Sequence, residues 1–173
     1  MTDQRESALI VPVPEAEDLV GVSRERYDDS ARTGVPAHLT LLYPFLQPED
    51  VTPADLERLA ALFAAAPATR YELVAVRRFT RGVLYLAPEP EAFLRELTRR
   101  IWTLYPHRPP YGGVFDDVIP HLTVAQTPDP VVLDAVEASV APGLPIAAHA
   151  REAWLMLQSD DGRWQAGHRF PLS

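Results

Sequence analysis

One short motif occurs twice in the chain, and this duplication constrains the fold more than any other feature. The first copy reads Pro-Ala-His-Leu-Thr around His38, and the second reads Pro-His-Leu-Thr around His121. In an extended strand, successive side chains alternate between the two faces. His38 therefore shares a face with Thr40, and His121 shares a face with Thr123. The apolar residues between and after them are left to pack on a hydrophobic core.

The segments that surround the two copies follow one order. Each half is predicted to contain a helix, the motif strand, a second helix and a two-stranded hairpin, because apolar residues recur at helical or alternating spacing between turn signals. The hairpins turn at Gly82 and Gly162. Apart from the two motif strands, the predicted helices cover residues 15–30, 53–66, 91–104 and 128–140, and the predicted strands cover residues 8–13, 71–79, 83–86, 146–158 and 163–170.

This order predicts an α+β fold with an internal pseudo-twofold repeat. The whole chain, residues 1–173, is expected to form a single bilobal domain with lobe-like halves at about residues 8–88 and 89–173. Equivalent strands placed around a common axis would line a central cleft and bring the two His/Thr faces together. With 173 residues, of which 47% are hydrophobic, the chain is long enough to bury such a core.

Composition excludes several kinds of site and partner. The chain has no cysteine, which excludes disulfides, thiolate metal ligands and a cysteine nucleophile. All 16 basic residues are arginine, so Schiff-base and lysyl-nucleotide chemistry are excluded as well. A formal net charge of −8 argues against binding an extended nucleic-acid duplex, because such binding depends on many cationic contacts to phosphates.

Nothing in the sequence predicts a membrane protein or a secreted one. No apolar run reaches the length that spans a bilayer, and the N-terminus lacks the basic and apolar regions of a signal peptide. We therefore expect a cytoplasmic protein without a membrane partner, with a monomer as the favoured state.

Two histidines suit a reaction in which one proton is removed while another is delivered, because imidazole titrates near neutral pH. Ester cleavage at phosphorus is such a reaction. One neutral imidazole would deprotonate the attacking water or ribose hydroxyl, and the other, as imidazolium, would protonate the leaving oxygen. The Thr40 and Thr123 hydroxyls would donate hydrogen bonds to the non-bridging phosphoryl oxygens. This chemistry needs no metal and no other cofactor.

Other chemistries fit the sequence less well. The G-x-S-x-G elbow of serine hydrolases, the P-loop and the dinucleotide fingerprint are all absent. A metal site at the two histidines would need carboxylates, and Asp116 and Asp117 are the only ones close in sequence. A lone histidine on a strand is more often structural than catalytic. The matched second copy is what favours a catalytic role here.

These residues resemble the 2H phosphoesterase superfamily, nearest to its bacterial 2'-5' RNA ligase-like branch. The similarity lies in the paired His-x-Thr motifs, in Pro44-Phe45 after the first copy, and in Trp164 and Phe170-Pro171-Leu172 near the end of the chain. It covers almost the whole chain. The resemblance implies a bilobal α+β fold with the motif strands lining a cleft. It also implies metal-independent hydrolysis of 2',3'-cyclic nucleotide phosphodiesters, with ligation of tRNA halves in some relatives.

The resemblance also assigns roles to individual residues. His38 and His121 carry over as the acid/base pair, and Thr40 and Thr123 carry over as phosphate-binding hydroxyls. Five residues after the second histidine, relatives in the ligase-like branch often have an arginine that helps to hold phosphate. This chain has Gln126 at that position, which leaves the charged phosphate contact and the identity of the substrate open.

Three aromatic residues are candidates for contacting a substrate. Tyr43 occupies the place in the first copy that Gln126 occupies in the second. Its odd spacing from His38 would turn it away from the cleft in a regular strand, so this contact requires a bend, and a core position is the alternative. Phe79 and Tyr85 could stack on a base, although aromatic residues on strands also fill cores. Arg81, Trp154 and Arg169 are weaker candidates for contacting a substrate.

The sequence therefore predicts a phosphoesterase that hydrolyses cyclic nucleotide or RNA-end phosphodiesters of the 2',3'-cyclic type. Its expected partner is a nucleotide or a short RNA end. One alternative is a 2'-5' RNA ligase or another enzyme that processes RNA ends. The other alternative is a module that binds nucleotides or RNA ends without turnover, although such a module has no need of two proton-transfer groups.

Overall fold

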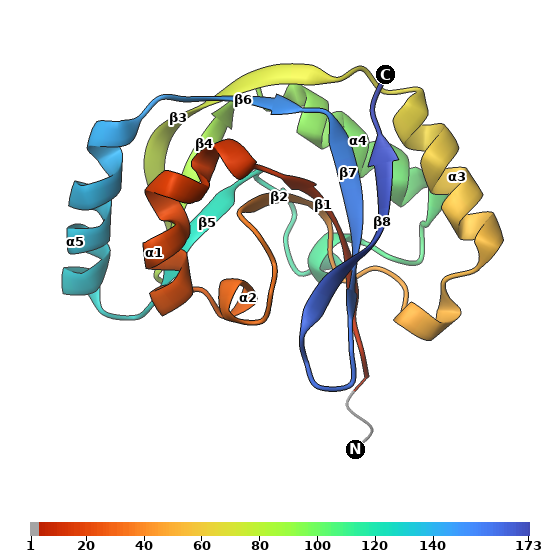
Figure 1. Cartoon of the computed structure of the whole chain (residues 1–173), viewed down its shortest axis with the longest axis horizontal. Helices are drawn as coiled ribbons and strands as arrows, with labels where there is room; N and C mark the ends of the chain where they lie inside the picture. Colours follow the sequence, from red (N-terminus) through yellow and green to blue (C-terminus); the bar gives the residue numbers. More distant parts are fainter. Residues whose placement is uncertain (1–3) are drawn as a thin grey trace.

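Two four-stranded antiparallel sheets form the centre of the molecule, and helices cover their outer sides (Figure 1). The structure is a computed structural model that describes residues 4–173. In chain order the elements are β1 (Ser7–Pro12), α1 (Glu17–Tyr27), α2 (Asp29–Arg32), β2 (His38–Leu42), α3 (Pro53–Ala64), β3 (Thr69–Phe79), β4 (Val83–Glu89), α4 (Ala92–Leu104), β5 (Leu122–Gln126), α5 (Pro130–Val140), β6 (Ile146–Ala150), β7 (Glu152–Gln158) and β8 (Trp164–Pro171).

Each sheet takes two strands from each half of the sequence. The first sheet has the order β2-β1-β7-β8, and the second has the order β5-β4-β3-β6. Figure 1 shows this exchange as the red β1 lying beside the blue β7. The predicted two-lobed α+β fold is confirmed, but residues 8–88 and 89–173 do not each build one sheet. The hairpin that follows each motif strand joins the sheet of the other motif.

The two motif strands are edge strands that meet at the centre of the molecule. β2 lies at one edge of the first sheet, β5 lies at one edge of the second, and the two strands are in contact. Helices α3 and α4 pack on the first sheet, while α1 and α5 flank the second. Apolar residues from both sheets and these helices form one continuous core, in which Leu39 and Leu122 of the motifs are fully buried.

Local sequence signals account for most element boundaries. Thr52 caps α3 as predicted, because its hydroxyl accepts a hydrogen bond from the Asp55 backbone N–H while the Asp55 carboxylate accepts one from the Thr52 N–H. The helix predicted at residues 15–30 is instead divided. Asp28 is extended and accepts a hydrogen bond from the Ser30 N–H, so α1 ends and α2 begins there.

A second correction concerns the single strand predicted over residues 146–158. The strand breaks at Arg151, so that β6 pairs with β3 in the second sheet and β7 pairs with β1 in the first. Between α4 and β5, where the sequence predicts no helix or strand, residues 110–113 form a short 3-10 turn in which Tyr111 has φ 51°.

Candidate active site

The two motif histidines are held in the same way. The Nδ1 atom of His38 lies 2.8 Å from the Pro36 carbonyl oxygen, and the Nδ1 atom of His121 lies 2.7 Å from the Ile119 carbonyl oxygen. A carbonyl only accepts hydrogen bonds, so Nδ1 carries the proton in both rings. Nε2 of each ring is therefore free to accept a proton or, once protonated, to donate one.

A β-bulge follows the threonine in each motif. In the first sheet Ile10 pairs with Thr40 and Leu9 pairs with Leu42, which leaves Leu41 as the extra residue. In the second sheet the same shift leaves Val124 as the extra residue. Two successive side chains then face the core, namely Leu41 and Leu42 in the first copy and Val124 and Ala125 in the second.

The bulges return the next residue of each strand to the face of the histidine. Tyr43 lines the same cavity as His38 and Thr40, which provides the bend that a cleft-facing Tyr43 requires. By the same alternation Gln126 lies on the face of His121, where its side chain is exposed. The two consecutive apolar residues after each threonine break the alternation of a regular strand, and this signal could have predicted the bulges.

Burial lowers the pKa of both imidazoles. Loss of hydration lowers the pKa of His38 to about 4; the hydrogen bond to Pro36 opposes this shift, and the charge of Arg24 adds to it. His121 also lowers the pKa of His38, and the strands of the two motifs, β2 and β5, are in contact. Burial lowers the pKa of His121 as well, against the effect of its hydrogen bond to Ile119. Both rings are therefore mainly neutral at pH 7.

Aromatic side chains surround His121. Phe79 and Tyr85, two predicted contact residues, stack on each other with ring centroids 4.2 Å apart. Both rings meet the imidazole edge to face, with centroid distances of 5.0 Å for Phe79 and 5.6 Å for Tyr85. Tyr85 is buried and Phe79 is half-buried, so the two rings shield one side of His121, which is itself half-buried, from water.

Tyr111 joins the two motifs and was not among the predicted site residues. Its ring is stacked 6.5 Å from His121 and lies 6.3 Å from the ring of Tyr43. Its backbone N–H donates to the Tyr43 carbonyl oxygen at 2.6 Å. Burial raises the pKa of the Tyr111 hydroxyl, and the Thr40 side chain opposes that shift. The sequence signal that could have indicated Tyr111 is the long stretch rich in proline and glycine before the second motif, because long loops in compact domains are often functional.

A cavity of about 360 Å³ opens beside His38 and Thr40. Ile10, Met156 and Trp164 contribute apolar walls, and the carboxylates of Glu6 and Asp29 lie at its polar side. Among the residues that the structure describes, no arginine lines this cavity. The cavity therefore suits a flat, uncharged group with hydrogen-bond donors better than it suits a polyphosphate.

The remaining predicted candidates lie elsewhere. Arg169 stacks on the ring of Trp154, 4.3 Å from its centre, and Arg81 is exposed in the hairpin turn. Asp117 accepts a 2.6 Å hydrogen bond from Arg95. Within residues 4–173, no group of three or more histidine and acidic side chains is arranged so that it could hold a metal ion.

Comparison with known proteins assigns the fold and its motifs to a family. The sequence model of the 2'-5' RNA ligase superfamily matches residues 11–162, which include both motifs. The chain belongs to this superfamily. A protein of Geobacillus kaustophilus named "Putative phosphoesterase GK0864" is 28% identical over 121 residues, which are 68% of this chain and 66% of that protein.

Solved structures support the same fold at low sequence identity. The crystal structure of E. coli LigT complexed with NADP+ has a TM-score of 0.61 and 20% identity, and it covers 99% of both chains. The structure of LigT complexed with 3'-AMP has a TM-score of 0.60 and 16% identity over the same share of both chains. The structure of TT0787 from Thermus thermophilus has a TM-score of 0.63 and 21% identity, and it covers 96% of this chain and 97% of that chain.

Among residues 4–173, none of the helices has the length and apolar character needed to cross a membrane.

Proposed function

We propose that this phosphoesterase-superfamily protein hydrolyses 2',3'-cyclic nucleotide phosphodiesters without a metal ion. The observation that carries the proposal is the duplicated geometry of the cleft. Two imidazoles, each anchored through Nδ1 so that Nε2 is available for proton transfer, belong to motifs whose strands β2 and β5 are in contact, and each is followed two residues later by a threonine hydroxyl. A single phosphorus atom bound between them would meet a proton acceptor on one side and a proton donor on the other.

In the proposed reaction, neutral Nε2 of one histidine removes a proton from water, and the water oxygen forms a new bond to phosphorus. The bond from phosphorus to one ribose oxygen breaks, and Nε2–H of the other histidine, as imidazolium, protonates that oxygen. The product is a nucleoside monophosphate. Both pKa values are low in the empty site, and the negative charge of a bound phosphodiester favours the protonated form of a neighbouring imidazole, which supplies the acid.

Thr40 and Thr123 are proposed to hold the non-bridging oxygens, whose charge must be stabilised as the reaction proceeds. Gln126 would add a neutral amide where some relatives have an arginine. Tyr111, Phe79 and Tyr85 would exclude water from the side of His121.

The nucleoside is proposed to occupy the cavity beside His38. Its volume of about 360 Å³ lies within the usual range for small-molecule sites. Trp164 and Tyr43 offer aromatic faces to a base, and stacking on aromatic rings is a common mode of base recognition. Structures of E. coli LigT with 3'-AMP and with NADP+ support a nucleotide as the ligand class.

Purified protein in EDTA should convert 2',3'-cyclic nucleotides to monophosphates, as read by phosphorus NMR. His38→Ala and His121→Ala should each lower kcat by about 10² to 10⁴. His107→Ala is the matched control, because His107 is exposed outside the cleft. Full activity in both motif variants would refute the proposal.

A second candidate is the joining of RNA ends, which the name of the matched superfamily favours. A gel assay with tRNA halves carrying 2',3'-cyclic and 5'-hydroxyl ends distinguishes the two reactions. Joined product that depends on both histidines would support ligation. Binding of a nucleotide in calorimetry without any product would instead support a binding module.

A further inference from the structure

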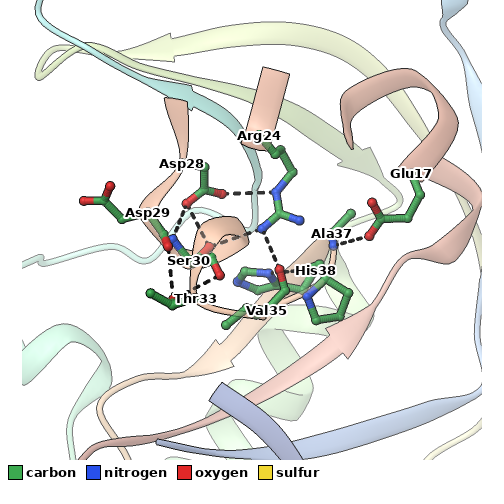
Figure 2. A network of polar contacts seen from close by, with 10 residues as sticks. Glu17, Arg24, Asp28, Asp29, Ser30, Thr33, Val35, Ala37 and His38 are labelled. Carbon is green, nitrogen blue, oxygen red and sulfur yellow. Dashed lines mark hydrogen bonds and ion pairs between the residues drawn. The ribbon is translucent and has the colours of Figure 1, made fainter. Parts of the chain in front are cut away.

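Arg24 links three segments around the first motif (Figure 2). It lies on α1, and only 2% of its surface is exposed. Its Nε donates to Asp28 Oδ2 at 3.1 Å, and its Nη2 donates to Ser30 Oγ at 3.2 Å and to the Val35 carbonyl oxygen at 3.1 Å. One guanidinium therefore holds the end of α1, the start of α2 and the approach to His38.

The segment before His38 is fixed throughout. Every backbone donor and acceptor of residues 35–37 has a partner, so the carbonyl that orients the imidazole cannot turn without breaking other hydrogen bonds. The bonds are Val35 N–H to Ser30 O (2.8 Å), Arg24 to Val35 O (3.1 Å), His38 Nδ1 to Pro36 O (2.8 Å), Ala37 N–H to Glu17 Oε1 (2.6 Å) and Val13 N–H to Ala37 O (2.8 Å).

The second motif has the same contact from a different arginine. Arg95 lies on α4, which precedes β5 as α1 precedes β2. Its Nη1 donates to the Val118 carbonyl oxygen at 3.2 Å and to Asp117 Oδ1 at 2.6 Å. Val118 stands three residues before His121, as Val35 stands three residues before His38. In both copies the next carbonyl along the chain accepts the hydrogen bond from histidine Nδ1.

Stability alone does not explain the repeated contact. Arg95 keeps 37% of its side chain exposed and already pairs with Glu91 at 2.8 Å. Exposed ion pairs contribute little to folding, and Arg100 and Glu96 make an equivalent pair on the same helix without touching the motif. What sets Arg95 apart from Arg100 is its contact with the backbone that carries His121.

We infer that Arg24 and Arg95 are equivalent positioning residues, one for each histidine. Each holds the carbonyl three residues before its imidazole, and this fixes the next carbonyl, which anchors Nδ1 and so aims Nε2 at the phosphorus. The inference rests on the proposed function for its effect on rate. Its structural content, the anchoring of the two Nδ1 protons, stands apart from any reaction.

Arg95→Gln tests the inference where the fold is least at risk, with Arg100→Gln as the matched control on α4. For a 2',3'-cyclic nucleotide, Arg95→Gln should lower kcat about 10- to 100-fold with KM within about twofold of wild type, because misplacement of a reacting group costs rate more than binding. The NMR signal of the His121 Nδ1 proton should also broaden through exchange with water. Arg100→Gln should match wild type in both measurements.

If Arg95→Gln matches Arg100→Gln in rate and in the imidazole signal, the inference is wrong. If the wild-type protein hydrolyses no cyclic phosphodiester, the proposed function fails, and the His121 signal alone decides the inference. An unchanged signal in Arg95→Gln would then overturn it.

Arg24 is tested by Arg24→Lys, which keeps the charge but replaces a planar fork with a point donor that cannot reach the same three acceptors. Within residues 4–173, Arg24, Asp28 and His121 are the titratable groups that act electrostatically on the pKa of His38. A displaced Arg24 charge leaves Asp28 less compensated, so the midpoint of the His38 titration in NMR should rise above wild type. A folded Arg24→Lys variant with unchanged kcat and an unchanged His38 midpoint would refute the role of Arg24.

Discussion

Each imidazole of the cleft is defined by its hydrogen bond to a backbone carbonyl two residues earlier. The sequence placed His38 and His121 on strands, but it could not show which ring nitrogen would be free. That choice depends on the carbonyls of Pro36 and Ile119, and the segments that carry them are held by side chains of α1 and α4. The candidate pair was therefore predictable from the motif, whereas the ring nitrogen that carries the proton was not.

The lowered pKa values predict an acidic pH optimum. For kcat/KM, the base must be neutral and the acid must be protonated in the free enzyme, so the rate rises with pH through the lower pKa and falls through the higher one. The pKa of His38 is about 4 and that of His121 lies below 6.5. Initial rates against a cyclic nucleotide should show a bell with its maximum between those values. A rate that still increases from pH 7 to pH 8 would contradict this prediction.

Glu6 predicts a preference among bases. One carboxylate oxygen accepts from the Tyr43 hydroxyl at 2.6 Å, and within residues 4–173 the other oxygen makes no hydrogen bond. Cytosine presents an amino donor where uracil presents a carbonyl that repels a carboxylate, so kcat/KM for 2',3'-cyclic CMP should exceed that for cyclic UMP about tenfold.

Glu6→Gln should bring this ratio close to one, because an amide can donate or accept. Glu49→Gln is the control, since Glu49 lies outside the cavity and pairs with Arg5. If Glu6→Gln leaves the ratio of the two kcat/KM values unchanged, Glu6 does not contact the base.

At the scale of elements, alternation and turn signals predicted the helices and hairpins but not their partners. The hairpin of β3 and β4 was predictable from residues close in sequence, whereas its pairing with β5 brings together segments far apart in the chain. The break at Arg151 within residues 146–158 was not predictable for the same reason. It arises because β6 pairs with β3 in one sheet and β7 pairs with β1 in the other. In the sequence, the bulges at Leu41 and Val124 are indicated only by two consecutive apolar residues after each threonine, where a regular strand would alternate polar and apolar residues.

The two hairpin glycines predict unequal effects of substitution. Gly82 and Gly162 have φ values of 75° and 80°, so alanine is strained at either position. A Cβ at Gly82 would also collide with the Thr127 carbonyl, whereas a Cβ at Gly162 would have no neighbour within 4 Å among residues 4–173. Gly162→Ala should cost about 1 to 2 kcal/mol of unfolding free energy, and Gly82→Ala should cost clearly more. Urea denaturation measures both, and equal losses would contradict the predicted clash.

At the scale of the whole molecule, the exchange of strands makes the two halves dependent on each other. The first half supplies β1 with β2 and β3 with β4, and each of these pairs is only half of a sheet. Two-stranded ribbons are marginally stable in water. Residues 1–90 and 91–173, prepared as separate fragments, should therefore lack a cooperative thermal transition. Mixing them should restore one, as followed by circular dichroism. A cooperative transition in either fragment alone would contradict this prediction.

The same exchange has a consequence during synthesis of the chain. His38 emerges from the ribosome long before β7 and β8, the strands that complete its sheet. A nascent or truncated polypeptide can therefore carry the first motif in full and still have no cleft. If the proposed function holds, such a chain becomes active on phosphodiesters only after its last hairpin, β7 and β8, has folded into the first sheet.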